Sequence, residues 1–170
     1  MSWTDEIKAW IPDYAKDIRL NLDAVVNRST LDEATVKGVC LAAAFAAGNA
    51  EIVERIKPTM LEEDSTAALT AASLMAMNNV WYPYVEMTED PALQGLPAQL
   101  RMNAYATHGG TTKTRFETYA LAASIVGKCH FCVKNHYDVL RKEGVSVEQL
   151  RDIGRTAAVI AAVCKLKTGA

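Results

Sequence analysis

The sequence predicts an all-α fold, and three observations lead to that prediction. Half of the 170 residues are apolar, aromatic residues make up only 7%, and alanine is abundant, a composition that favours closely packed helices. Apolar residues recur three and four positions apart along most of the chain, which is the period of an amphipathic helix. No stretch shows the two-residue alternation of a strand. A chain of this length is long enough for one well-buried domain and short for two.

Periodicity divides most of the first half of the chain, about residues 1–80, into four predicted helices. Pro12 separates the first two, Gly48 and Asn49 end the third, and Pro58 stops the fourth. In chain order, these helices span Thr4–Trp10, Tyr14–Val26, Leu31–Ala47 and Ile52–Lys57.

A fifth, longer helix is expected to be capped by Ser65 or Thr66 and to be ended by Asn78-Asn79 and Pro83. Prolines and glycines dominate the segment 82–110 that follows. We therefore expect this segment to be a connector that contains one or two short helices.

Three further helices are predicted in the second half, about residues 98–170. Gly127 is expected to break the first of them, and Gly144 to cap the second. They span Thr114–Val126, the segment after Gly127 as far as Lys142, and Val147–Lys165.

The two halves show a weak internal duplication. Leu41–Asn49 aligns with Ala120–Lys128, and Thr70–Asn78 aligns with Thr156–Cys164. The first half therefore predicts the same helices without the reactive side chains. In this alignment Gly38, Ala50, Val53 and Lys57 stand where the second half has Glu117, Cys129, Cys132 and His136.

The second half carries a C-x-x-C motif, Cys129 and Cys132, with His136 one helical turn after the second cysteine. At ~100° per residue the three side chains fall within roughly 60° on one helix face, whereas His130 points elsewhere. Such a motif is typical of a redox dithiol or a metal site, and two inert core thiols are a further alternative. A structural zinc site would need a fourth ligand, and no second Cys/His pair follows at finger spacing.

The position of the motif at the start of a helix favours a thiolate, which is the nucleophile of redox chemistry. The unsatisfied amide groups and the positive end of the helix dipole stabilise negative charge there, and Lys128 and Lys134 add to it. On this argument alone Cys129, which is nearer the helix start, would be the thiol of lower pKa.

Glu117 is the candidate partner of the imidazole. It lies in an otherwise apolar stripe with Ala120, Leu121 and Ser124, where a carboxylate is costly to bury without a partner. A carboxylate can orient and charge His136, which can then accept a proton from Cys132 directly or through a water. Without that context, a salt-bridged helix glutamate is the usual interpretation.

Other conspicuous side chains receive structural interpretations. Each of them is expected to lie in the interior, at the surface, in a loop or at a subunit contact. Cys40, Cys164, Met75, Met77 and Met87 are expected to fill the core, His130 to lie at the surface, His108 to lie in a loop, and Trp81, Tyr82 and Tyr84 to line a subunit contact.

Charge and hydropathy limit the partners and the location. The net charge of −2 is spread without a basic block, so nothing indicates nucleic acid or an anionic membrane. The longest apolar run, Cys40–Ala47, is far below the ~20 residues of a membrane helix. The polar start MSWTDEIKAW has no signal-peptide pattern, so the cytoplasm is the expected location.

Taken together, these segments resemble the alkylhydroperoxidase D family over nearly the whole chain. The resemblance is specific because motif, spacing and surroundings agree. It rests on PDYAKDIRLNL near the start, MAMNNVWY in the middle, LRMNAYATHGG, FETYALAASIVGKCHFCVKNH and the final alanine-rich helix.

The resemblance implies an all-helical domain of the carboxymuconolactone-decarboxylase-like fold, which is usually a homotrimer. It further implies a dithiol that reduces hydroperoxides or an oxidised peroxiredoxin of the alkyl hydroperoxide reductase C type. Protein-bound dihydrolipoamide would then reduce the resulting disulfide, with no tightly bound cofactor or metal. In such proteins the roles fall on Glu117 as base, His136 as relay, Cys132 as attacking thiolate and Cys129 as its partner.

One position departs from the family pattern, and two other function classes remain open. The family carries a histidine immediately before the second cysteine, but this chain has Phe131 there and His130 one place earlier. A second proton-transfer group is therefore not expected. The alternatives are a decarboxylase-like relative acting on a ring lactone, whose chemistry needs no paired thiols, and a structural or metal-binding helical oligomer.

Overall fold

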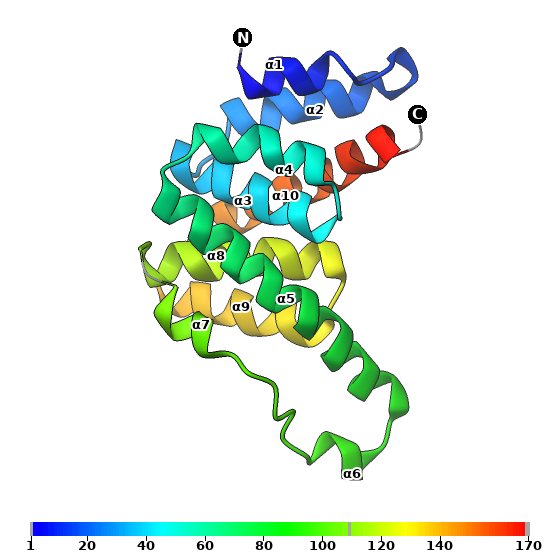
Figure 1. The fold of residues 1–170 in the computed structure, drawn as a ribbon, viewed down its shortest axis with the longest axis vertical. Coiled ribbons are helices and arrows are strands. Elements are labelled where there is room, and N and C mark those ends of the chain that lie inside the picture. The colour runs from blue at the N-terminus through cyan, green and yellow to red at the C-terminus, as the bar shows by residue number, and fades with distance from the viewer. Residues whose placement is uncertain (1, 109, 169–170) are drawn as a thin grey trace.

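The computed structural model describes residues 2–108 and 110–168, and within these ranges the chain forms helices and loops without strands, as the sequence predicted (Figure 1). The helices and short 3-10 turns follow one another in the order α1 Trp3–Lys8, η1 Asp13–Ala15, α2 Lys16–Asn27, α3 Glu33–Ala46, α4 Ala50–Ile56, η2 Lys57–Thr59, α5 Glu62–Thr88, α6 Pro91–Gln94, α7 Asn103–Thr107, α8 Lys113–Gly127, α9 His130–Lys142 and α10 Val147–Thr168.

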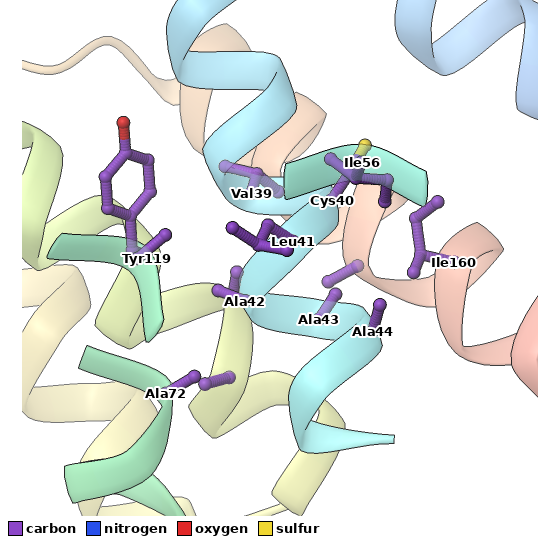
Figure 2. Packing of buried hydrophobic residues seen from close by; sticks show 14 of the residues in the cluster. Val39, Cys40, Leu41, Ala42, Ala43, Ala44, Ile56, Ala72, Tyr119 and Ile160 are labelled. Carbon is purple, nitrogen blue, oxygen red and sulfur yellow. The ribbon is translucent and has the colours of Figure 1, made fainter. Parts of the chain in front are cut away.

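Helix α3 lies at the centre of the core and contacts α5, α8 and α10. The run Val39–Ala44 is fully buried, and its alanines let the neighbouring helices approach closely. Figure 2 shows this run surrounded by Ile56 from α4, Tyr119 from α8 and Ile160 from α10. The abundance of alanine in the sequence thus has a packing cause.

One close approach in this core joins α3 to α8 at Gly38. A Cβ atom on Gly38 would overlap the ring of Tyr119, which is itself fully buried. Glycine is therefore required here by space, because the tyrosine ring occupies the volume that a side chain on α3 would need.

Helix α5 begins earlier than the sequence predicted, and neither Ser65 nor Thr66 caps it. Leu61 is the N-cap, and the first turn contains Glu62 and Glu63, whose negative charge suits a helix start. Ser65 lies inside the helix and donates its hydroxyl to the carbonyl of Glu62 (3.0 Å). Ser65 is the fourth residue of the helix and follows an acidic first turn, so a serine at this place does not mark the cap.

The predicted end of α5 at Asn78-Asn79 and Pro83 is also wrong, because the helix continues through Pro83 to Thr88. Asn79 belongs to a tertiary contact: its side-chain amide donates to the carbonyl of Ala123 on α8 (3.1 Å). Packing of α5 against α8 and α9 outweighs the local preference of proline to end a helix.

Beyond the body of the molecule, the C-terminal part of α5, the short helix α6 and the loop 95–102 form a projecting arm (Figure 1). The chain reverses at Glu89, which has a left-handed φ of 52°. The two short helices expected in the connector are α6 and α7. Met87 lies on the arm and is 76% exposed, so its predicted place in the core is wrong.

The internal duplication stays a prediction, although the two halves share one local feature. Helices α3, α4 and α5 follow one another as α8, α9 and α10 do. Asn49 begins α4 and accepts a hydrogen bond from the backbone of Ile52, just as Cys129 begins α9 and accepts one from Cys132. This register differs by one position from the alignment Leu41–Asn49 with Ala120–Lys128.

Two glycine substitutions test the packing of the core. Gly38→Ala should lower the free energy of unfolding by ~1–3 kcal/mol, because the new methyl group overlaps the Tyr119 ring. Gly154→Ala is the matched control in α10, where a Cβ meets nothing within 4 Å, and it should raise that energy by ~0.5–1 kcal/mol. Urea unfolding of both variants measures the difference, and equal stabilities would contradict the packing at Gly38.

Candidate active site

The junction between α8 and α9 positions the C-x-x-C motif. Helix α8 includes Gly127, Lys128 adopts a left-handed φ of 56°, and Cys129 is the N-cap of α9. The expectation that Gly127 itself breaks the helix is therefore off by one residue. Gly127 serves a different purpose, because a Cβ atom there would overlap the side chain of Asn79 on α5.

Cys129 and Cys132 form a disulfide, with their Cα atoms 5.3 Å apart. The sulfur of Cys129 also accepts a hydrogen bond from the backbone N–H of Cys132 (3.2 Å), in the manner of an N-cap side chain. Both cysteines are buried, at 0% and 3% exposure. Reagents therefore reach this pair through cavities.

Glu117 and His136 meet in the interior between α8 and α9. Oε2 of Glu117 lies 2.7 Å from Nδ1 of His136, and the two residues are 1% and 4% exposed. The carboxylate is therefore buried with the partner that the sequence predicted for it. A carboxylate accepts at this position, so Nδ1–H donates and the imidazole is fixed in one orientation.

The other imidazole nitrogen contacts a residue whose role the sequence did not reveal. Nε2 of His136 lies 3.1 Å from the sulfur of Met75 on α5. Met75 is 1% exposed, so its predicted place in the core is confirmed. A methionine at helical spacing gives no sign that it faces a histidine, and sequence offers no signal for this contact.

A cavity of about 340 Å³ gives access to Cys132 and His136. Its wall is largely apolar, and Phe131 lines it while stacking on Tyr82, with ring centroids 4.2 Å apart. The remaining residues around the cavity are Met75, Asn78, Met102, Tyr105, Ala106 and Asn135. The residue that replaces the family's histidine is thus part of an aromatic wall.

Cys129 borders a different and shallower hollow of about 350 Å³ on the outer side of α9. Lys128, Lys134 and Tyr137 are among its lining residues. The two sulfurs of the motif therefore adjoin different cavities, and only Cys132 shares its cavity with His136.

The other cysteines lie away from this site. Cys40 and Cys164 are buried in α3 and α10, as predicted. Burial raises the pKa of the Cys164 thiol to about 12 and the pKa of the Cys40 thiol well above its usual range. Neither thiol forms a thiolate near neutral pH, so neither is a nucleophile.

The remaining histidines are structural or exposed. His130 points outward, with its side chain 82% exposed and 3.1 Å from Glu86. His108 follows α7 and stacks on Phe116, with ring centroids 4.2 Å apart. Both agree with the surface and loop positions expected from sequence.

The described ranges, 2–108 and 110–168, offer neither a metal site nor a membrane-spanning helix. They contain no group of three or more His, Cys, Asp or Glu side chains arranged to hold a metal ion. No helix in these ranges is both long enough and apolar enough to cross a membrane.

Comparisons with known proteins agree with this site. The model of the Carboxymuconolactone decarboxylase family matches residues 91–170, which include Glu117, both motif cysteines and His136. Among curated relatives, a Streptomyces avermitilis protein is 41% identical over 94% of this chain and 92% of its own length. A Rhodospirillum centenum protein is 40% identical over 94% and 87%, and a Coxiella burnetii protein is 40% identical over 90% and 90%. All three relatives are named alkyl hydroperoxide reductase AhpD, and this similarity over nearly the full length shows that the chain belongs to the AhpD family.

Proposed function

We propose that this chain is an antioxidant thiol–disulfide oxidoreductase whose Cys129–Cys132 pair reduces hydroperoxides, regenerates an oxidised peroxiredoxin of the C type, or does both. The observation that carries the proposal is the placement of Cys132 and His136 on one cavity, with Glu117 holding the far nitrogen of the imidazole. The names of the relatives support hydroperoxide reduction.

In the oxidative half of the cycle, His136 accepts the proton of the Cys132 thiol, and Glu117 stabilises the imidazolium that results. The Cys132 thiolate attacks the terminal oxygen of the hydroperoxide, the O–O bond breaks, and the alkoxide leaves and takes up a proton from solvent to become an alcohol. The sulfenic acid formed on Cys132 is then attacked by the Cys129 thiol, which yields the disulfide and releases water.

The structure supports Cys132 rather than Cys129 as the attacking sulfur. Only Cys132 adjoins the cavity of His136, whereas Cys129 borders the outer hollow. The helix dipole favours Cys129, but a base one turn away on the same cavity decides which thiol loses its proton during turnover.

In the reductive half, we propose that a protein-bound dihydrolipoamide supplies two electrons. Its two thiols become a cyclic disulfide while the protein disulfide becomes two thiols, so a dithiol donor completes the exchange without a metal or bound cofactor. A lipoyl-bearing protein and a C-type peroxiredoxin are then the two partners. A decarboxylase acting on a ring lactone has no use for the disulfide, and nothing in the site favours that alternative.

We further propose that the protein is a homotrimer assembled through the projecting arm. Val80, Met87 and Leu96 are 71%, 76% and 64% exposed on this arm, a concentration of apolar surface that favours a protein contact. Trp81 and Tyr84 pack against each other on the same part of α5, with ring centroids 5.8 Å apart. The arm extends away from the body, where a second copy can cover it (Figure 1).

Thiol counting tests the dithiol cycle. On the reduced protein, cumene hydroperoxide should remove two of the four thiols, and dihydrolipoamide should restore both, because Cys40 and Cys164 are buried and protonated. Cys129→Ser and Cys132→Ser should each abolish turnover, whereas the control Cys40→Ala should retain it. Turnover that survives in either motif variant would refute the cycle.

Separate variants test the proton relay. Glu117→Gln and His136→Gln should each lower kcat/KM for the hydroperoxide by about 10²–10⁴-fold, because proton transfer from Cys132 loses its base or the group that charges it. The control is His130→Gln, which removes a histidine that is 82% exposed and lies 3.1 Å from an exposed glutamate. Circular dichroism checks the fold of each variant. An unimpaired Glu117→Gln enzyme, or an equal loss in the control, would count against the relay.

Sedimentation equilibrium tests the assembly. The wild type should have three times the mass of the 18.5 kDa chain, and Met87→Lys should shift it toward monomers by placing a charge in the apolar contact. Leu20→Lys on α2, which is 56% exposed and lies far from the arm, is the control and should leave the mass unchanged. A monomeric wild type would rule out the trimer.

A further inference from the structure

The imidazole of His136 is held at both nitrogens, and the second contact has no place in the relay described above. Nδ1 meets Glu117 at 2.7 Å, and Nε2 meets the sulfur of Met75 at 3.1 Å. A thioether sulfur has no proton and can only accept. The short contact is therefore a hydrogen bond when Nε2 carries a proton, and a contact between two lone pairs when it does not.

We propose that Met75 is a positioning residue that keeps a proton on Nε2 of His136 while Cys129 and Cys132 are in the disulfide form. This inference rests on the proposed function, since it assigns that proton to the reduction of the disulfide. Met75 acts through His136 and touches neither substrate nor reacting sulfur in the step itself.

The step that uses this proton is thiol–disulfide exchange. A thiolate of the dithiol donor attacks the sulfur of Cys129, the bond between Cys129 and Cys132 breaks, and its electron pair leaves on the sulfur of Cys132. The proton on Nε2 neutralises this thiolate. The second thiol of the donor then attacks the donor's own sulfur in the mixed disulfide. The donor is released as a cyclic disulfide, and Cys129 leaves and takes the proton of that second thiol.

The geometry favours this role over simple filling of space. Met75 comes from α5, whereas Cys132 and His136 lie on α9, so the contact of its sulfur with Nε2 joins two helices at the wall of the cavity. A leucine side chain of similar volume would fill the same site but would remove the sulfur that Nε2–H contacts. A buried N–H that loses its acceptor is destabilised.

Asn78 and Asn135 also line the cavity and carry amide oxygens, so Met75 is one of several acceptors near the imidazole and the one in contact with Nε2. The titratable groups that face His136 or its cavity are Glu117 from α8, Cys132 from α9, Tyr82 from α5 and Tyr105 from α7. Glu117 is engaged at Nδ1, and Cys132 is in the disulfide. Met75 is therefore the acceptor in contact with Nε2 in this disulfide form.

Nitrogen-15 NMR of histidine-labelled oxidised protein tests the proposal without any substrate. Nε2 of His136 should show the chemical shift of a protonated nitrogen in the wild type, and of an unprotonated one in Met75→Leu. The glutamine variant, Met75→Gln, offers a carbonyl acceptor and should restore the protonated shift. Met77→Leu, the same change two positions along α5, is the control.

The pH dependence of disulfide reduction by dihydrolipoamide gives the second readout. Removing the acceptor disfavours a proton on Nε2, so the disulfide of Met75→Leu should be reduced about tenfold more slowly than that of the wild type at the high-pH end of the profile. Met75→Gln should return the profile toward that of the wild type.

Two results would overturn the proposal. An unprotonated Nε2 in the oxidised wild type would refute it whether or not the variants fold. If Met75→Leu keeps both the protonated Nε2 chemical shift and the wild-type pH profile of disulfide reduction, Met75 serves only to fill space in the core. Absence of hydroperoxide turnover with an intact NMR signature would instead count against the proposed function.

Discussion

One buried hydrogen bond, between Glu117 and His136, connects the packing of this protein to its chemistry. A carboxylate at 1% exposure is tolerated because the imidazole lies 2.7 Å away, and the imidazole arrives there because α9 begins at Cys129. That beginning depends in turn on α5, since the side chain of Asn79 binds the end of α8 and lies against Gly127. Three helices must therefore pack correctly before the proposed base of the dithiol is in place.

The sequence predicted most of the fold and the part of the site that lies close together in the chain. Helical spacing placed Cys129, Cys132 and His136 on one face, and the carboxylate of Glu117 in an apolar stripe indicated a buried partner. The features that the sequence did not predict depend on tertiary packing. Helix α5 continues through Pro83 because it packs against α8 and α9, and local helix propensity does not include such tertiary contacts. Family resemblance, rather than periodicity, separated redox chemistry from a zinc site.

Contacts between segments that are distant in the chain could not be predicted from local sequence patterns, for the same reason. Met75 lies 61 positions before His136, and its helical spacing was equally consistent with core packing. The stacking of Phe131 on Tyr82 gives a purpose to a residue that the sequence could describe only as a departure from the family. In both cases the missing information was which face of α5 meets α9, and no pattern within either helix specifies it.

The burial of Cys40 and Cys164 has a consequence for how electrons pass through the molecule. Because neither thiol can form a thiolate near neutral pH, the described chain stores two electrons in one place, between Cys129 and Cys132. A second pair of electrons cannot be stored until the first pair has left. Donor and acceptor must therefore take turns, which in steady-state kinetics gives parallel lines in a double-reciprocal plot, the pattern of a substituted-enzyme mechanism.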